Sequence, residues 1–293
     1  MKYKLLTLLF MMLTTTAMAQ NKDKPAYRLF TAEGKSINYG KMLKALQEAD
    51  VVLFGEQHND PIAHWLQLEV AKDLYQENAD KFAIGAEMFE TDVQLVLDEY
   101  LAEQVPEKNF EQEARPWPNY ATDYRPVVRF AKEKNIPFIA TNAPRRYAAM
   151  VSAGSLTALE GISEGAKKFI APLPVTVNME LPGYKGMLAM FGNSTHGNTK
   201  SQNIVQAQAL KDAPMAHFIL KQVKEGRQVL HLNGAYHSDN FEGIGWYLKQ
   251  EQPQLNVATV TTVTQEELER LSDEHRNKAD FILVVPASMT KTY

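Results

Sequence analysis

The stretch VVLFGEQHND, residues 51–60, combines the features from which the fold and a candidate site can be inferred. Its run of apolar residues fits a short buried strand, and Gly55 ends that run. The segment that follows brings Glu56, His58 and Asp60 close together in the chain. A tight turn after a strand uses the glycine and the aspartate, but it needs neither a glutamate nor a histidine. Glu56 and His58 are therefore candidate functional residues.

Further buried strands alternate with amphipathic helices along the chain. The strands are expected at 82–89, 136–144, 227–237, 255–263 and 280–286. The helices are expected at 39–49, 61–78, 92–103, 123–135, 145–154 and 243–250. This alternation is typical of βαβ units and predicts an α/β fold with a mainly parallel sheet flanked by helices. Residues 20–35 are interpreted as a polar lead-in to a single domain over 20–293.

Polar side chains recur where the expected strands end. Right-handed crossovers place the carboxyl ends of parallel strands at one edge of the sheet, and open α/β sheets bind ligands at that edge. The polar residues at these ends are Glu56, His58, Glu87, Asn142, Asn233 and His237. We therefore predict that carboxylates, imidazoles and amides from separate strands converge on one site.

These side chains are compatible with more than one kind of site. Histidine and carboxylate ligands suit zinc or manganese, so Glu56, His58, Glu87 and His237 are candidate ligands of a divalent metal, although their spacing matches no compact metal motif. The same residues could serve as acid and base in a hydrolase, or form salt-bridged turns with no ligand. Motifs for serine hydrolases, nucleotide phosphates and dinucleotides are absent from the sequence. His64, on the following helix, is interpreted as structural.

Residues 155–205 interrupt the alternation of strands and helices. The segment contains methionine and aromatic residues among glycines and prolines, and we interpret it as an inserted, partly helical lobe. Tyr184, Met187 and Met190 could form an adaptable apolar binding surface there, and His196 lies in the same segment. A small local core beneath a surface lobe is an equally compatible interpretation.

The N-terminus has the pattern of a secretory signal peptide. Lys2 and Lys4 precede an apolar run and the small residues before Ala19, which predicts a signal peptide over 1–19 and export to the periplasm or cell envelope. The chain has no cysteine, which excludes disulfides, thiolate metal sites and a lipobox cysteine. Cleavage removes two lysines, so the formal net charge of -4 becomes -6, and the composition gives no electrostatic reason to bind nucleic acid.

Several segments together resemble the ChaN-type haem-binding uptake proteins. The segments are LFGEQHND (53–60), GAEMFE (85–90), YRPVVRFAKEKNIPFIATNAPRRY (124–147), QAQALKDAPMA (206–216) and NGAYH (233–237). That family is similar in turn to the erythromycin esterase and Tiki protease superfamily. The resemblance covers residues 50–285 and implies an α/β core with a helical lobe, export, and a part in haem or iron acquisition with an outer-membrane haem uptake system.

The resemblance also implies how haem binds. In the haem-binding relatives two haems stack between two subunits, a tyrosine is the iron ligand, and a histidine of the partner contacts a propionate. Several tyrosines lie in plausible regions, namely Tyr120, Tyr124, Tyr147, Tyr184 and Tyr236. The residues expected to bind haem are Tyr184, Met187, Met190 and His196 of the lobe, with Tyr147 and Arg145 beyond the third strand.

In the hydrolytic relatives the first and last motifs carry the chemistry. Their residues correspond to Glu56, His58 and His237, with Glu87 in the second acidic motif. The sequence thus favours an exported haem-binding protein that forms a homodimer on haem binding. A metal-dependent hydrolase that uses these residues is the alternative, and an interaction protein that only retains the fold is a third hypothesis.

Overall fold

The computed structural model describes residues 23–192 and 197–293. The predicted signal peptide and His196 lie outside the described residues. The strands are β1 (Arg28–Thr31), β2 (Ser36–Ile37), β3 (Val51–Glu56), β4 (Phe82–Glu90), β5 (Phe138–Asn142), β6 (Gln228–Gly234), β7 (Val257–Gln265) and β8 (Phe281–Pro286). The helices are α1 (Tyr39–Gln47), α2 (Pro61–Asn78), α3 (Gln94–Leu101), α4 (Glu107–Glu113), α5 (Arg125–Lys134), α6 (Arg145–Gly154), α7 (Glu164–Lys167), α8 (Pro182–Gly192), α9 (Gly197–Lys224) and α10 (Ile244–Glu251).

The strands form one sheet in the order β2-β1-β8-β7-β3-β6-β4-β5. The strands from β8 to β5 are parallel, and β1 pairs antiparallel with both β8 and β2. The predicted α/β fold with a mainly parallel sheet is thus confirmed. The interpretation of 20–35 as a polar lead-in was wrong for β1, because Leu29 and Phe30 are buried and the strand extends the sheet beyond β8.

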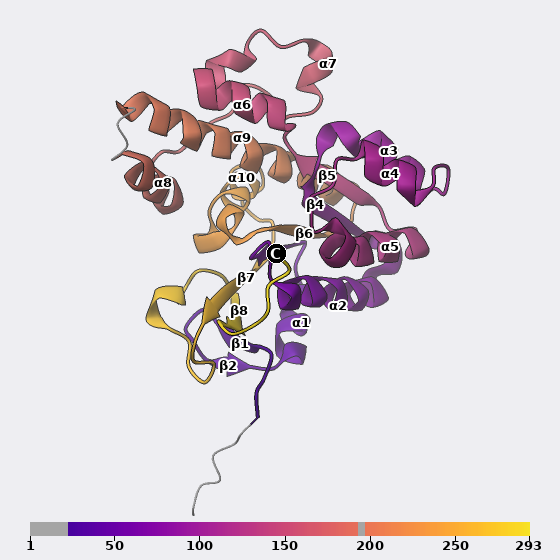
Figure 1. Ribbon diagram of the computed structural model, residues 1–293, viewed down its shortest axis with the longest axis vertical. Helices are drawn as coiled ribbons and strands as arrows, with labels where there is room; N and C mark the ends of the chain where they lie inside the picture. Colours follow the sequence, from indigo (N-terminus) through magenta and orange to yellow (C-terminus); the bar gives the residue numbers. More distant parts are fainter. Residues whose placement is uncertain (1–22, 193–196) are drawn as a thin grey trace, which may run out of the picture.

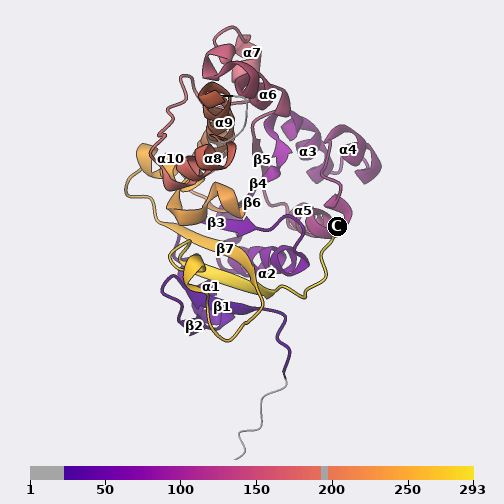
Figure 2. The same ribbon diagram turned by 60° about the vertical axis from the view of Figure 1, so that its left-hand side comes forward.

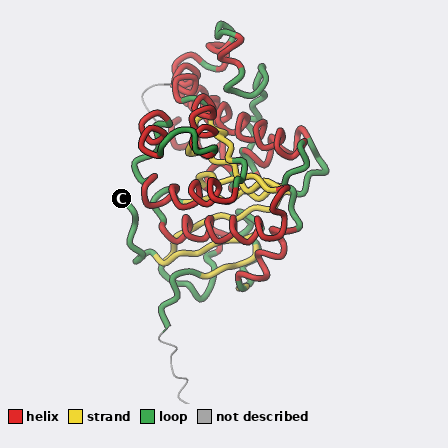
Figure 3. Tube along the Cα trace, turned by 90° about the vertical axis from the view of Figure 1, so that its right-hand side faces the viewer, coloured by secondary structure: helices red, strands yellow, loops and turns green. Residues whose placement is uncertain are grey.

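Helices cover both faces of the sheet, as Figures 1 and 2 show. Side chains of α1, α2 and α5 share one buried cluster with the sheet, and those of α6, α9 and α10 share another on the opposite face. In Figure 3 the strands are seen between layers of helices. The sheet is therefore shielded on both faces, and a ligand reaches it from the edge where the strands end.

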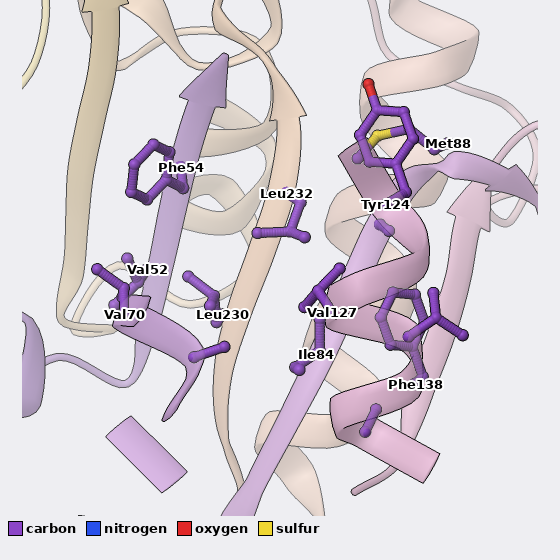
Figure 4. Packing of buried hydrophobic residues seen from close by; sticks show 14 of the residues in the cluster. Val52, Phe54, Val70, Ile84, Met88, Tyr124, Val127, Phe138, Leu230 and Leu232 are labelled. Atoms are coloured by element: carbon purple, nitrogen blue, oxygen red, sulfur yellow. The ribbon is translucent and has the colours of Figure 1, made fainter. Parts of the chain in front are cut away.

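β3 shows how the sequence determines the two faces. Val52 and Phe54 belong to the cluster that includes α1, α2 and α5, whereas Val51 and Leu53 belong to the cluster of α9 and α10. Figure 4 shows the first cluster, with side chains of β3 and β6 close to Val70 of α2. Because successive side chains of a strand point to opposite faces, a continuous apolar run suits a strand that is covered on both.

The loop after β3 is fixed by Gly55 and by the start of α2. A Cβ on Gly55 would lie only 2.9 Å from the backbone that follows β6, so any larger residue would push the two segments apart. Asp60 accepts two hydrogen bonds of 3.0 Å from backbone N–H groups in the first turn of α2. Both residues therefore have structural roles, and the functional question concerns Glu56 and His58.

Residues 155–205 contain α7, α8 and the first turns of α9 in place of another βα unit. Tyr184 of α8 and Val205 of α9 are buried in a small cluster between the two helices, while Met190 is 74% exposed. The local core and the exposed apolar surface therefore coexist in this lobe. Nowhere in the described ranges is a helix both long enough and apolar enough to span a membrane.

Candidate functional site

The carboxyl ends of β3, β6 and β4 lie side by side in the middle of the sheet. Glu56 is the last residue of β3, Glu87 lies near the end of β4, and His237 follows β6. A cleft of about 510 Å³ opens at this edge, and its lining includes His58, Glu87, Asn142 and His237. The structure therefore brings together residues that the sequence placed at separate strand ends, with Glu56 directly behind His58.

Glu56 is the centre of a buried hydrogen-bond network. Its Oε1 accepts a bond of 2.6 Å from the Tyr124 hydroxyl and lies 3.0 Å from Nδ1 of His58. Its Oε2 accepts a bond of 2.7 Å from the Gln67 amide and lies 3.4 Å from Nδ1 of His64. The Glu56 carboxylate is therefore fixed from several sides, and it orients the His58 ring.

Two charges are stabilised in this network. Burial alone would raise the pKa of Glu56, but the hydrogen bonds of His58 and His64 outweigh it and lower that pKa to about 2. Burial would lower the pKa of His64, but the hydrogen bond to Glu56 and the charges of Glu56 and Asp123 raise it to about 9. The pKa of His58 is also raised, because its hydrogen bond to Glu56 and the nearby carboxylates outweigh burial. His64 is thus a buried cation between the carboxylates of Glu56 and Asp123. The sequence indicated only a structural role for this residue and did not reveal its charge.

His237 lies between two buried carboxylates. Its Nε2 is 3.1 Å from Oε1 of Glu87, and its Nδ1 is 2.5 Å from Oδ1 of Asp212. The other oxygen of Glu87 accepts a bond of 2.7 Å from the N–H of Gly234. The other oxygen of Asp212 accepts a bond of 2.7 Å from the Tyr184 hydroxyl. Both ring nitrogens of His237 are therefore occupied by carboxylates.

This arrangement keeps the His237 imidazole charged. Burial would lower its pKa, but the charges and hydrogen bonds of Glu87 and Asp212 raise it to about 10. Burial would likewise raise the pKa of Glu87, but the charge and hydrogen bond of His237 hold it well below its usual value. Asp212, in α9, was not among the predicted site residues. The signal that could have found it is the segment 206–216, which contains it and contributes to the family resemblance.

His58 is the histidine that remains open to the cleft. Its side chain is 39% exposed, and its ring packs edge-on against Trp117 at a centroid distance of 4.8 Å. Nδ1 faces Glu56, and within the part of the chain that the structure describes Nε2 has no hydrogen-bond partner. An imidazole oriented by a carboxylate, with its second nitrogen free, can bind a metal centre or accept a proton.

Gly234 provides the space that the His58 ring occupies. A Cβ at this position would lie 2.6 Å from Cε1 and 2.9 Å from Nε2 of His58, so the ring must move in Gly234→Ala. We expect this change to lower the free energy of unfolding by about 1–3 kcal/mol in urea denaturation. Gly161→Ala is the control, since its Cβ would meet no atom within 4 Å. Equal stability of the Gly234→Ala and Gly161→Ala variants would show that the His58 ring can move without cost.

The structure gives no support to the predicted metal site of His58, His237, Glu56 and Glu87. Across residues 23–192 and 197–293, no group of three or more His, Asp or Glu side chains is arranged to hold a metal ion. The reason is that these groups pair with one another. Glu56 binds His58, and Glu87 binds His237, whose second nitrogen faces Asp212.

Comparison with known proteins identifies the family. A family model described as haem-binding uptake, Tiki superfamily, ChaN, matches residues 42–248. This chain belongs to that family. The resemblance inferred from the sequence is thereby confirmed. No curated protein matches the chain.

One solved structure, ChaN of Campylobacter jejuni, supports the same fold, and two more distant ones are also similar. ChaN of Campylobacter jejuni, in its structure with cofacial haem binding, is 18% identical, with 90% of this chain and 98% of that chain covered and a TM-score of 0.68. A mutant of erythromycin esterase EreC is 12% identical over 88% of this chain and 82% of that chain, with a TM-score of 0.43. The type III effector HopBA1 is 12% identical over 83% and 91%, with a TM-score of 0.49. At these identities the likeness to ChaN of C. jejuni shows the fold alone.

The tyrosines predicted as haem ligands do not line the cleft of this ChaN-family protein. Tyr184 is only 3% exposed, because α8 packs on α9 and its hydroxyl donates to Asp212. Its expected place in an exposed patch was therefore wrong. Tyr147 is buried under the Arg146 guanidinium, and the hydroxyl of half-exposed Tyr236 donates to a backbone oxygen of α8. Tyr120 and Tyr124 are also buried.

Other predicted haem-binding residues do reach the cleft. Met187 of α8 lines one wall, and Arg145 lies on the rim with an 83% exposed side chain. Arg115 and Lys211 line the same cleft and were not predicted. Met190 is exposed on α8 but does not line it. The cleft of this ChaN-family protein thus combines side chains of the sheet edge with side chains of the lobe.

Proposed function

We propose that this protein binds haem in the cleft at the carboxyl edge of the sheet. The observation that carries the proposal is the composition of that cleft, which joins an open imidazole, an apolar wall and a cationic rim. Membership of the haem-binding ChaN family supports the same function. The volume of about 510 Å³ lies within the range of roughly 300–1,000 Å³ that is usual for ligand pockets.

The walls of the cleft suit a porphyrin. Met187 and Ile204 from the lobe and Ala149 from α6 contribute apolar surface, and a flexible methionine adapts to a flat ring. Arg145 and Lys211 supply positive charge to the cleft, and Arg145 lies 3.9 Å from the Glu90 carboxylate, which lines it too. A guanidinium binds a carboxylate through two parallel hydrogen bonds, so Arg145 is suited to a propionate.

His58 is the residue that we assign to the iron. Haem, when bound, would supply an iron, and the His58 imidazole is the group of this cleft that would hold it. Metal-binding histidines usually donate their other N–H to a carboxylate or carbonyl, and Glu56 accepts from His58 at 3.0 Å. The tyrosine ligand that the resemblance implied has no counterpart in the described lining of the cleft.

A haemin titration tests this function. The Soret band of haemin should shift on addition of the protein and reach a saturable stoichiometry. Ala149→Trp places an indole in the cleft from an exposed position of α6, and we expect it to weaken haem binding at least about tenfold, a loss of roughly 1.4 kcal/mol. Ala153→Trp, an exposed change on the same helix outside the cleft lining, is the matched control. Equal affinity of the two variants would exclude haem from this cleft.

We further propose that the protein is exported by residues 1–19 to the periplasm or cell envelope and there supports iron acquisition. The mass of the protein recovered from the envelope fraction tests the cleavage after residue 19. We also propose that the protein forms a homodimer on haem binding and contacts an outer-membrane haem uptake system. Light scattering with and without haemin tests the dimer.

The metal-dependent hydrolase is not proposed. That function would use His58 and His237 as metal ligands or as acid and base. Both nitrogens of His237 face carboxylates, so this residue has no free lone pair to accept a proton from a substrate. No observation on this cleft favours hydrolysis over haem binding.

A further inference from the structure

A second cleft lies on the side of α9 away from the haem cleft. It has a volume of about 490 Å³ and is bounded by the C-terminal half of α9, by α10 and by residues 171–176. The two clefts share no lining residue, although α9 contributes to both. The Tyr247 hydroxyl of α10 donates a bond of 2.6 Å to the carbonyl of Thr176, which holds one wall in place.

One side of this second cleft is basic. His217, Lys221 and Lys224 line it from successive turns of α9, where residues three and four apart share a helix face. Burial and the charges of Lys221 and Lys224 lower the pKa of His217 to about 4, so its imidazole is neutral at pH 7. Burial also lowers the pKa of Lys221. The positive charge of this side therefore comes from Lys221 and Lys224, beside a neutral imidazole.

Apolar side chains make up much of the remaining lining, together with the polar residues Thr176, Gln250 and Glu251. Pro172, Pro174 and Val175 come from the segment before α8, and Trp246 comes from α10. Leu220 and alanines of α9 also line the cleft. The cleft thus combines an apolar surface with two lysine ammonium groups at one side.

We propose that this second cleft binds a monoanionic amphiphile, a carboxylate attached to an aliphatic chain. The carboxylate would lie against Lys221 and Lys224, with the neutral His217 as a further hydrogen-bond donor, and the chain would lie along Trp246. The cleft presents no arginine fork, and Glu251 also lines it. A single compact charge therefore suits it better than a phosphate dianion, which the Glu251 carboxylate would repel.

Calorimetric titration of the full chain with octanoate, octan-1-ol and acetate tests the proposal. Octanoate should bind at least about tenfold more tightly than octan-1-ol, because its carboxylate accepts charge-assisted hydrogen bonds that the alcohol cannot form. Acetate should not bind measurably. Octanoate should also change the tryptophan fluorescence of the wild type but not that of Trp246→Phe. Equal affinity for octanoate and octan-1-ol, or no octanoate binding at millimolar concentration, would overturn the proposal.

Charge variants separate this site from the haem cleft. The double variant Lys221→Gln/Lys224→Gln should lose at least about tenfold in octanoate affinity. Lys108→Gln/Lys200→Gln removes the same charge at exposed positions outside the second cleft and should bind octanoate as the wild type does. Unchanged octanoate binding in the first variant would refute the assignment. The haemin titration should be the same in both double variants, so failure of haem binding leaves this test intact.

Discussion

Replacement of His237 by glutamine should lower the free energy of unfolding by about 3–5 kcal/mol, the usual cost of leaving a buried charge without its partner. The reason lies in the two carboxylates that flank the ring. Asp212 is 1% exposed and Glu87 is 4% exposed, so water cannot solvate either charge once the imidazolium is gone. The glutamine amide retains a hydrogen-bond donor but no charge. Urea denaturation of the wild type and the variant measures the difference.

A second substitution shows whether charge is the cause. His237→Gln combined with Asp212→Asn leaves one uncompensated carboxylate instead of two, and part of the lost stability should return. If His237 acted only as a packed ring, the second change would destabilise the protein further, because the Tyr184 hydroxyl would lose a charged acceptor. A loss below about 1 kcal/mol in the single variant would contradict an ionic triad.

The same triad predicts a pH dependence of stability. The pKa of His237 is raised to about 10 in the folded protein, against 6.5 for an ordinary histidine side chain. Below pH 6.5 both states carry the proton and the full stabilisation is present, whereas between pH 6.5 and 10 unfolding releases the proton and stability falls as pH rises. The stability difference between the wild type and His237→Gln should therefore shrink over this window. A constant difference from pH 6 to pH 10 would contradict the raised pKa.

The sheet edge was predictable because parallel topology imposes it. Once alternating strands and helices are recognised, the residues at the strand ends, such as Glu56, Glu87 and His237, must lie at one edge. The sequence also anticipated a structural role for Gly55 in the turn. The first strand, β1, was not predicted, because it is short and its buried residues lie within a polar segment.

The partners of these residues were not predictable from local patterns. Asp212 reaches His237 from a helix, and no strand end marks its position. His64 lies one turn into α2, where helical periodicity indicates a buried face but not a contact with Glu56. Tyr184 illustrates the opposite error, because the composition of the lobe does not reveal which face of α8 packs on α9.

Replacement of His58 by glutamine should weaken haem binding at least about tenfold with little loss of stability. The side chain is 39% exposed, and Glu56 keeps the hydrogen bonds of Tyr124 and Gln67 without it. The ferric absorption spectrum should change as well, because the imidazole proposed to hold the iron is gone. Haemin titration and the spectrum of the saturated complex measure both effects, and His275→Gln is a control outside the lining of the cleft.

The position of the ring matters as well as its presence. Glu56→Gln keeps His58 but weakens the acceptor that orients it, and loss of such a partner typically costs roughly 10–100-fold in metal affinity. We therefore expect its haem affinity, corrected for the folded fraction, to fall between those of the wild type and His58→Gln. A different outcome would contradict the assignment of the iron to His58. If His58→Gln retains the wild-type spectrum while Met187→Leu alters it, the iron is bound by the lobe, and the sheet edge contributes only the shape of the cleft.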